Sequence, residues 1–555
     1  MRWIMVIGPI MDQQAPVLPN KSVNSYGLQF LFLFICLTIY SITPIWTNEY
    51  FPTQDGPGHL YCCSVLLQLG NHASPLPEYF FELGSFLSPY WLGHLLILLF
   101  MKIAPPLLAE KLFLTLYALI FIISIYYYVE SANRQNLPVA LFAIPFAFNF
   151  IFMMGFYNYA LGIPLFFLAI GYTWKHRENL TASRLLLLSV FLLLIYFTHF
   201  LALVITCLSI SLVGVFALIK NRVKLLQLFA AMIPALALVM HFLLKHRFGG
   251  GPHWDSFSLL SYLITLDTLN AFPDTAVLFS YFLAALLWGL ALFTIWKLLR
   301  PGNGGGKTTG QDIPEKPLQD SPTFTRIFPL FLSFLLLVIY YLLPDRSLVD
   351  SMLNVQGGGW TSTRLSIFPV LASLGWISLP RGRGPRQLLL LGLAVAIGAK
   401  IHNTNTLIGK ASAEIGQYVS GIGAIERDSI VMPIQTGIPQ YYNRISPLLH
   451  AGALYCINNG SVNLSVEFPD YDYYPINFKM SSRQARPSPL ITNNMWNLLH
   501  EYGYVIDYAI SWKMKKNSPE WRTLSSVFNV CYEKGPLVVF QNRYRHQLPV
   551  VKDGG

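Results

Sequence analysis

Two residues near the start of the chain have side chains suited to acid–base chemistry. Asp55 and His59 lie four residues apart in the stretch Pro52-Thr-Gln-Asp55-Gly-Pro-Gly-His59. A helix that begins near Pro57 would bring them together at its N-terminus, where free N–H groups and the helix dipole favour anions. A carboxylate in that position suits a general base that faces a phosphate-bearing substrate. The alternative is a plain surface turn in which Asp55 only caps the helix.

A basic residue later in the chain is suited to hold a phosphate. Arg364 follows Gly357-Gly-Gly-Trp-Thr-Ser-Thr363 at the start of an apolar run. Its planar guanidinium could bind a phosphate through two donors. An interfacial arginine that extends its charge to the membrane surface explains the same position. Lys245, His246 and Arg247 form a second basic cluster on the same expected side, and we take Lys245 and Arg247 as further candidates.

Three more polar residues interrupt apolar stretches: Tyr157, Asn158 and His199. A polar side chain at membrane depth is costly and often functional, and a broken helix inside a membrane usually lines a cavity. A hairpin turn, or a histidine that bonds a backbone carbonyl, would explain them as well. We therefore treat all three as candidate substrate-binding residues.

The elements that must position these side chains are membrane helices. Of the 555 residues, 54% are hydrophobic and 12% are charged, whereas soluble domains have about 25% charged residues. The net charge of +11 does not indicate nucleic-acid binding, because the basic residues cluster in short loops between apolar runs.

A span needs ~20 apolar residues. About eleven passes are expected, at 27–46, 88–104, 112–129, 137–174, 184–198, 200–219, 226–244, 275–297, 327–343, 364–380 and 386–400.

Loop charges predict the orientation of these passes. Residues 47–101 contain no Lys or Arg, so the first loop, 47–87, is expected outside. The N-terminal segment 1–26 and the glycine-rich linker 298–326 are expected in the cytoplasm, because basic loops stay inside. Two stretches stay open: 137–174 is one broken pass or a hairpin, and 184–219 is one long helix or two short ones. Either choice predicts the same side of the membrane for the last third of the chain.

From about residue 401, the sequence pattern changes from long apolar runs to shorter helix and strand patterns. A helix is expected at 404–424, and strands are expected at 429–433, 504–511 and 536–541. Helix–strand alternation favours a small α/β domain over 401–555. The predicted fold is thus an all-α polytopic membrane domain, 27–400, followed by an extracytoplasmic α/β domain.

Two cysteines fall in this α/β domain. Cys456 and Cys531 are the only cysteines there, so a disulfide within the domain would have to join them. Oxidising conditions outside the cell would let such a bond persist. Two buried free thiols are the alternative.

This layout resembles the GT-C glycosyltransferases, which take sugars from polyprenyl-phosphate carriers and include protein O-mannosyltransferases and the lipid A aminoarabinose transferase. The likeness rests on the acidic residue in a long first outer loop, the number of spans and the outer C-terminal domain. The segments Gly155-Phe-Tyr-Asn-Tyr-Ala-Leu-Gly162 and Tyr196-Phe-Thr-His199 are similar to segments of bacterial members. Gly56 stands where a second acidic residue is common in the family, so no metal site is expected.

The resemblance implies an inverting glycosyltransferase of the plasma (inner) membrane. Asp55, with His59 beside it, would act on an acceptor hydroxyl, and Arg364 would bind the lipid phosphate of the donor. The expected partners are a polyprenyl-phosphate-linked sugar, membrane lipid and an acceptor glycan, lipid or protein, without nucleic acid and without a cofactor. Two other functions stay open: a lipid or saccharide transporter, although no internal repeat is evident, and a non-catalytic envelope assembly protein that retains only the fold.

Overall fold

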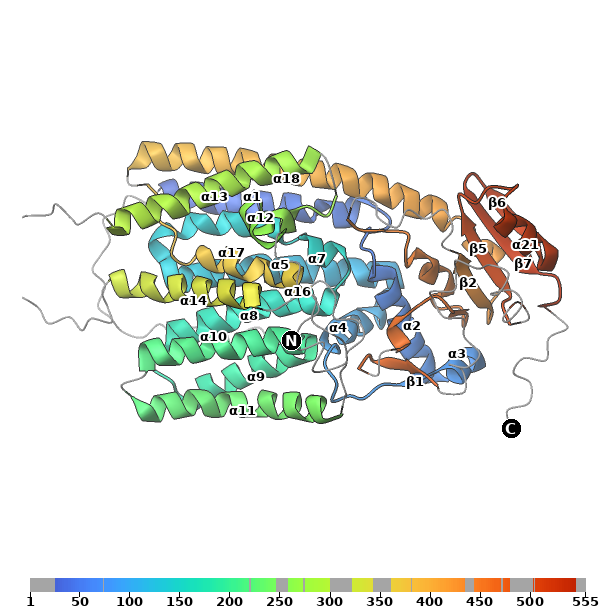
Figure 1. Ribbon diagram of the computed structural model, residues 1–555, viewed down its shortest axis with the longest axis horizontal. Helices are drawn as coiled ribbons and strands as arrows, with labels where there is room; N and C mark the ends of the chain where they lie inside the picture. The colour runs from blue at the N-terminus through green and yellow to red at the C-terminus, as the bar shows by residue number, and fades with distance from the viewer. Residues whose placement is uncertain are drawn as a thin grey trace, which may run out of the picture.

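The molecule consists of a bundle of long helices and a smaller part that contains β-strands beyond one end of the bundle, which we call the sheet end (Figure 1). The computed structural model describes residues 25–72, 74–218, 221–245, 258–272, 275–299, 322–342, 361–380, 382–434, 444–470, 473–479, 503 and 505–545. Most of the N-terminal segment 1–26, most of the linker 298–326, and His246 and Arg247 lie outside the described residues.

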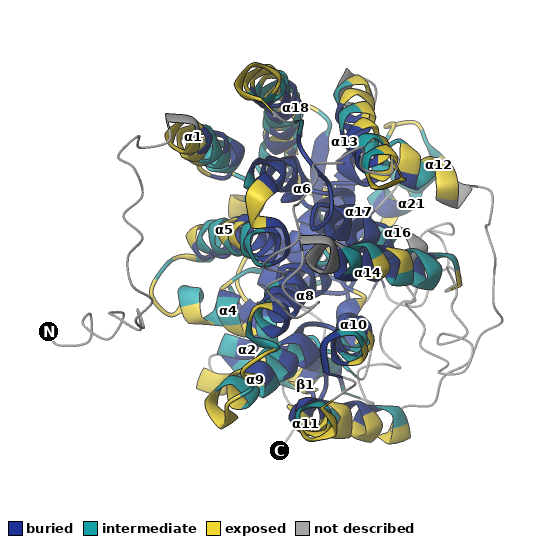
Figure 2. Ribbon diagram, turned by 90° about the vertical axis from the view of Figure 1, so that its left-hand side faces the viewer, coloured by how far each residue is buried: buried dark blue, intermediate teal, exposed yellow. Residues whose placement is uncertain are grey.

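Apolar runs form the bundle, because in lipid a helix satisfies its backbone N–H and C=O groups within one segment. Among the described residues, six helical segments have the length and hydropathy of membrane spans, and three shorter apolar helices accompany them. The peripheral helices expose much of their outward faces (Figure 2), and large apolar side chains such as Phe32, Leu186 and Leu244 are exposed. A polytopic membrane domain explains this surface, while the number of eleven passes stays a prediction.

The long helices of the bundle are α1 (Ser25–Thr47), α5 (Pro106–Asn133), α8 (Tyr157–His176), α9 (Ala182–Thr198), α10 (Phe200–Leu218), α11 (Arg222–Lys245), α13 (Thr275–Leu299), α14 (Pro322–Leu342) and α18 (Arg383–Tyr418). Shorter helical pieces connect or extend them. These are η1 (Arg134–Phe142), α6 (Ala143–Phe146), α7 (Phe150–Met153), α12 (Ser258–Ile264), η2 (Asp267–Leu269), α16 (Thr361–Leu365) and α17 (Ile367–Ser373).

The structure decides both open stretches. The chain turns at Gly155 between α7 and α8, so 137–174 is a hairpin. His199 has an extended backbone, φ −166° and ψ 126°, between α9 and α10, so 184–219 forms two helices. The pass expected at 88–104 is wrong, because α4 (Leu92–Met101) has only 10 residues. At 1.5 Å per residue that is about 15 Å, roughly half of the hydrocarbon core.

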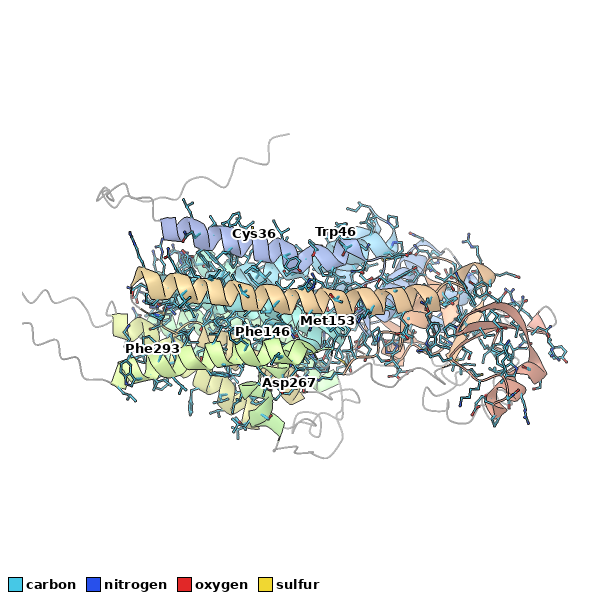
Figure 3. All side chains as sticks on the ribbon, turned by 90° about the horizontal axis from the view of Figure 1, so that it is seen from above. Cys36, Trp46, Phe146, Met153, Asp267 and Phe293 are labelled. Carbon is cyan, nitrogen blue, oxygen red and sulfur yellow. The ribbon has the colours of Figure 1, made fainter. Side chains whose placement is uncertain are left out.

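The last helix, α18, joins the two parts of the molecule. The separate helices expected at 386–400 and 404–424 are wrong, since both belong to one helix of 36 residues. Such a helix is about 54 Å long, and it runs from the bundle to the sheet (Figure 3). The domain boundary expected at residue 400 therefore falls inside a continuous helix.

A mixed sheet forms the core of the C-terminal part. Its strands run in the order β3-β2-β5-β7-β6, with β3, β2 and β5 parallel and the other neighbours antiparallel. The predicted strands correspond to β2, β5 and β7, so the α/β fold class is confirmed. The strand β6 and the helix α21 were not expected. The bounds are β2 (Ile430–Ile434), η4 (Ile422–Ala424), η5 (Ala451–Cys456), β3 (Val462–Asn463), η6 (Phe468–Asp470), β5 (Tyr508–Trp512), α21 (Pro519–Val527), β6 (Phe528–Lys534) and β7 (Leu537–Asn542).

The first loop is built into this C-terminal part. After α2 (Gly56–Asn71) and α3 (Pro75–Phe80), the short strand β1 (Phe81–Leu83) pairs with β4 (Ile476–Phe478) in an antiparallel sheet. Segments from opposite ends of the sequence therefore share backbone hydrogen bonds.

Cys456 and Cys531 are not bonded to each other. Cys456 is buried and Cys531 is exposed, and both are free thiols. The thiol of Cys531 donates to the carbonyl of Val539 across the sheet. The disulfide hypothesis is therefore wrong for this structure.

Candidate active site

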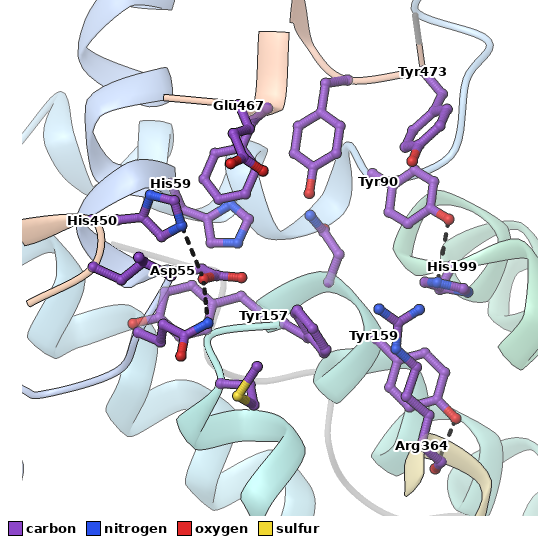
Figure 4. A pocket seen from close by; sticks show the side chains of 17 residues that line it. Asp55, His59, Tyr90, Tyr157, Tyr159, His199, Arg364, His450, Glu467 and Tyr473 are labelled. Carbon is purple, nitrogen blue, oxygen red and sulfur yellow. Dashed lines mark hydrogen bonds and ion pairs between the residues drawn. The ribbon is translucent and has the colours of Figure 1, made fainter. Parts of the chain in front are cut away.

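A cavity of about 360 Å³ lies where the sheet end of the bundle meets the C-terminal part (Figure 4). Six of the eight predicted site residues line it: Asp55, His59, Tyr157, Asn158, His199 and Arg364. We call the wall formed by residues numbered between 54 and 364 the floor. The opposite wall comes from the segments 444–470 and 473–479, which we call the roof. The floor also contains Gln54, Tyr90, Met154, Phe156 and Tyr159, and the roof contains Leu449, His450, Glu467, Phe468, Tyr473 and Tyr474.

Asp55 stands at the beginning of α2, as its sequence predicts. Pro57 in the first turn of the helix supplies a preset φ and needs no hydrogen-bond acceptor. The Asp55 side chain makes no capping hydrogen bond, so the capping explanation is wrong. Its carboxylate is turned toward the cavity instead (Figure 4).

The hairpin turn at Gly155 holds the backbone of Asp55. The Asp55 N–H donates to the carbonyl of Met154 over 3.1 Å. Gly155 has φ +87°, and a Cβ on it would lie 2.5 Å from the Asp55 nitrogen. Only glycine fits this turn, because a side chain would be strained by the backbone angle and would collide with Asp55.

The Asp55 carboxylate is buried, with 6% of the residue exposed. Its Oδ1 atom lies 3.3 Å from Nε2 of Gln54 and 3.5 Å from Nε2 of His450. Burial raises the pKa of Asp55 to about 7, and nearby Glu467 adds to this rise, whereas the Gln54 hydrogen bond and the charge of Arg364 oppose it. A carboxylate with a pKa near 7 is suited to general base catalysis at neutral pH.

Both ring nitrogens of His59 contact groups other than Asp55. Nε2 contacts the carbonyl of Gly155 at 2.9 Å, and Nδ1 contacts Nε2 of His94 at 3.0 Å. The ring is stacked on Phe468 of the roof, with the ring centroids 5.0 Å apart. Burial and the adjacent His94 hold the pKa of His59 well below its ordinary value. These contacts support a neutral histidine that organises the floor, rather than one that acts directly with Asp55.

Tyr157 and Asn158 hold neighbouring helices at the floor. The hydroxyl of Tyr157 donates to Oε1 of Glu110 on α5 over 3.0 Å. The Oδ1 atom of Asn158 accepts from the N–H of Gly93, over 2.7 Å, at the start of α4. Both residues therefore fix the positions of helices around the cavity that they line.

Gly56 has a steric reason to lack a side chain. A Cβ there would lie 2.2 Å from Oγ1 of Thr53, 2.4 Å from the Tyr157 hydroxyl and 2.9 Å from Oε1 of Glu110. The carboxylate of Glu110 therefore lies close to Gly56, the position next to Asp55 at which this sequence has no acidic residue. Glu110 was not among the predicted site residues.

His199 is fixed in one tautomer by its surroundings. Its Nδ1 accepts the N–H of Leu201 at 3.2 Å, so Nε2 carries the proton. Nε2–H then donates to the hydroxyl of Tyr90 at 3.2 Å. The break between α9 and α10 therefore supplies a neutral, polar wall to the cavity.

Arg364 brings a positive charge to the cavity. Its guanidinium lies 4.4 Å above the ring of Phe156 and 5.6 Å from the ring of Tyr159. Among the described residues it has no ion-pair partner, and its Nε has no hydrogen-bond acceptor. The hydroxyl of Tyr159 donates to the Arg364 carbonyl and so holds the backbone in place. This is a cation available to an anionic ligand.

Lys245 does not belong to the cavity. It is the last residue of α11 and is exposed. Arg247 lies outside the described residues. The basic cluster at 245–247 therefore makes no described contribution to the site.

The roof was missed by sequence reasoning. No local pattern marks His450, which contacts Asp55 from far along the chain. The stretch Glu467-Phe-Pro-Asp-Tyr-Asp-Tyr-Tyr474 is rich in acidic and aromatic residues between strands, and that composition was the available signal. Within the described part of the chain, no group of three or more His, Cys, Asp or Glu side chains is arranged to hold a metal ion.

The comparisons with known proteins support the fold. No protein-family model matches the sequence, and no curated protein matches it. Among solved structures, the chain is similar to ArnT from Cupriavidus metallidurans in the apo state, with a TM-score of 0.52 and 10% sequence identity. The similarity covers 93% of this chain and 97% of that chain. The fold is therefore similar to that of ArnT along nearly the whole chain, with a polytopic membrane domain followed by an α/β domain.

Proposed function

We propose that this protein is a membrane glycosyltransferase that moves a sugar from a polyprenyl-phosphate carrier to an acceptor hydroxyl. The observation that carries the proposal is the convergence of Asp55 and Arg364 on one cavity. The fold is similar to that of ArnT, and the resemblance of the sequence to the GT-C glycosyltransferases supports a lipid-linked donor.

The reaction would be a single displacement with inversion at the anomeric carbon. Asp55 takes the proton of the acceptor hydroxyl while the acceptor oxygen bonds the anomeric carbon. The bond from that carbon to the phosphate oxygen breaks, and the lipid phosphate leaves with the electron pair. Arg364 lies at the other end of the cavity from Asp55 (Figure 4), and its guanidinium stabilises the charge on the departing phosphate.

The sheet end of the bundle would face the outside of the cell. The loop that contains Asp55 has no Lys or Arg, whereas Lys175 and Arg184 lie near the other ends of α8 and α9. Basic loops remain in the cytoplasm. Transfer would then take place at the extracytoplasmic surface, and the C-terminal domain would be extracytoplasmic.

Purified protein offered a panel of polyprenyl-phosphate sugars tests this function. We expect transfer from at least one donor, with inversion of the anomeric centre. Asp55→Asn should reduce the rate ~10²–10⁴-fold, which is the usual contribution of general base catalysis. Wild-type transfer that survives in Asp55→Asn would remove Asp55 as the base, and no transfer from any donor would favour a non-catalytic role.

A further inference from the structure

The side-chain contacts of the Asp55 carboxylate involve one of its two oxygens. Two side-chain nitrogens, Gln54 Nε2 at 3.3 Å and His450 Nε2 at 3.5 Å, approach the same oxygen, Oδ1. No described side chain donates a hydrogen bond to the other oxygen, Oδ2. One oxygen is thus held by the protein, and the other is left to a ligand in the cavity.

Both donors depend on a short segment of the roof. His450 ends a turn in this segment, and the N–H of Ser446 donates to Oε1 of Gln54 over 2.9 Å. With its oxygen engaged there, the amide of Gln54 must direct Nε2 toward Asp55. Gly452 allows this segment to approach β2, because a Cβ on it would lie 2.3 Å from Cγ of Pro433. This segment therefore directs two side-chain nitrogens toward one carboxylate oxygen.

The tautomer of His450 follows from its buried environment. Nδ1 is buried and has no hydrogen-bond partner among the described residues. A buried N–H without an acceptor is costly, so the ring proton belongs on Nε2, which faces Asp55. The distance of 3.5 Å is long for a hydrogen bond, but such contacts are often loose before substrate binds.

We propose that His450 is a positioning residue that holds Oδ1 of Asp55 through its Nε2–H and thereby leaves Oδ2 to accept the proton of the acceptor hydroxyl. This inference rests on the proposed role of Asp55 as the base. The proton moves from the hydroxyl to Oδ2, and His450 stays neutral throughout. Ionisation of Asp55 therefore depends on a residue of the C-terminal part.

The charges around Asp55 are consistent with this role. The charged and titratable residues that line the cavity with Asp55 include His450 and Glu467 from the roof, and Arg364, Tyr157 and His59 from the floor. Burial lowers the pKa of His450 to about 4, so the ring is a neutral donor at pH 7. A neutral donor favours the ionised form of a carboxylate. Loss of this donor should raise the pKa of Asp55.

Two substitutions of His450 distinguish the effect of its N–H donor from the effect of its size. His450→Leu removes the donor, and His450→Gln keeps an N–H at a similar reach. The protonated carboxyl of Asp55 can be titrated directly by infrared difference spectroscopy of purified protein, with Asp55→Asn identifying its band. The pH dependence of kcat/KM gives a second readout, and His402→Leu, an exposed histidine on α18, is the control.

We expect the infrared midpoint of Asp55 to rise by about one pH unit in His450→Leu, and kcat/KM at pH 6 to fall about tenfold, since one unit corresponds to a factor of ten. His450→Gln should keep most of the wild-type midpoint. An unchanged midpoint in His450→Leu, or an equal shift in both variants, overturns the proposal. The titration needs no activity, so the result for His450 stands apart from the test of glycosyl transfer.

Discussion

The floor and the roof of the cavity are held in different ways. Backbone contacts between helix ends fix the floor, such as the bond from the Asp55 N–H to the Met154 carbonyl. The roof consists of turns, 3-10 helices and short strands. It is attached by side chains such as Arg444 and by the three residue pairs of the β1–β4 sheet. The floor thus rests on backbone contacts within the bundle, whereas the roof contributes polar contacts from the C-terminal part.

Arg444 is the best-connected attachment of the roof. Its guanidinium lies 2.9 Å from the carboxylate of Asp267 and donates to the carbonyl of Asn270 and the hydroxyl of Tyr262. It also lies 4.2 Å above the ring of Phe150. One side chain therefore ties the C-terminal part to three separate elements of the bundle.

The largest effect is expected from a change in the floor, Gly155→Ala. The new Cβ would collide with Asp55, and the left-handed backbone angle would add strain. We expect transfer to fall at least ~100-fold, because small displacements of a reacting group are costly, and stability to fall by ~1–3 kcal/mol. Rate assays and thermal melts measure both. Gly289→Ala on α13, where a Cβ meets nothing within 4 Å, is the matched control, and equal effects at the two sites would contradict a rigid floor.

A smaller effect is expected from Arg364→Lys, which keeps the charge but loses the planar fork. We expect KM for the lipid-linked donor to rise about tenfold, with a modest change in kcat. Steady-state kinetics with varied donor measure this. Arg383→Lys, at an exposed arginine of α18, should behave as the wild type. Unchanged donor affinity in Arg364→Lys would indicate an arginine that only anchors the protein at the membrane surface.

A change in the roof, Arg444→Gln, should have a weaker effect on chemistry and a local effect on structure. Without the ion pair to Asp267, amide hydrogen exchange over 444–479 should speed up while exchange in the bundle stays slow. Transfer should fall a few-fold, roughly 3- to 10-fold, in keeping with one lost charged contact. Arg522→Gln on the exposed side of α21 is the control. Faster exchange throughout the bundle would show that floor and roof are one cooperative unit.

The smallest effect concerns stability and pH. The pKa of Asp55 is about 7 in the folded protein and about 3.9 in an unfolded chain. The folded state therefore binds more protons between these values, and the stability contributed by the protonated carboxyl is lost as the pH rises through about 7. At pH 8, the free energy of unfolding of Asp55→Asn should exceed that of the wild type by on the order of 1–3 kcal/mol, so the variant should melt at a higher temperature. At pH 4 the variant and the wild type should melt at similar temperatures. A higher melting point of the wild type at pH 8 would contradict the burial of an ionised Asp55.

Local patterns in the sequence predicted much of the floor and the fold class. Apolar runs marked the bundle helices, Pro57 marked the start of α2, and glycine at 155 marked the turn. The three predicted strands lie in the sheet. The failures have local causes too. The apolar run 88–104 has the composition of a span, yet α4 covers only ten residues of it, and no residue near 400 revealed that α18 continues.

The sequence by itself determined that this is a polytopic membrane protein with an acidic residue after its first helix, because hydropathy and turn residues act over a few neighbours. Only the tertiary structure decided what surrounds that residue. Gly56 indicated a missing second carboxylate, yet the fold brings Glu110 from α5 beside it. The bond between Gln54 and Ser446 joins residues 392 positions apart. Contacts of this kind produce no periodic pattern in the sequence. They form only in the folded protein, when burial of the C-terminal part removes both partners from water.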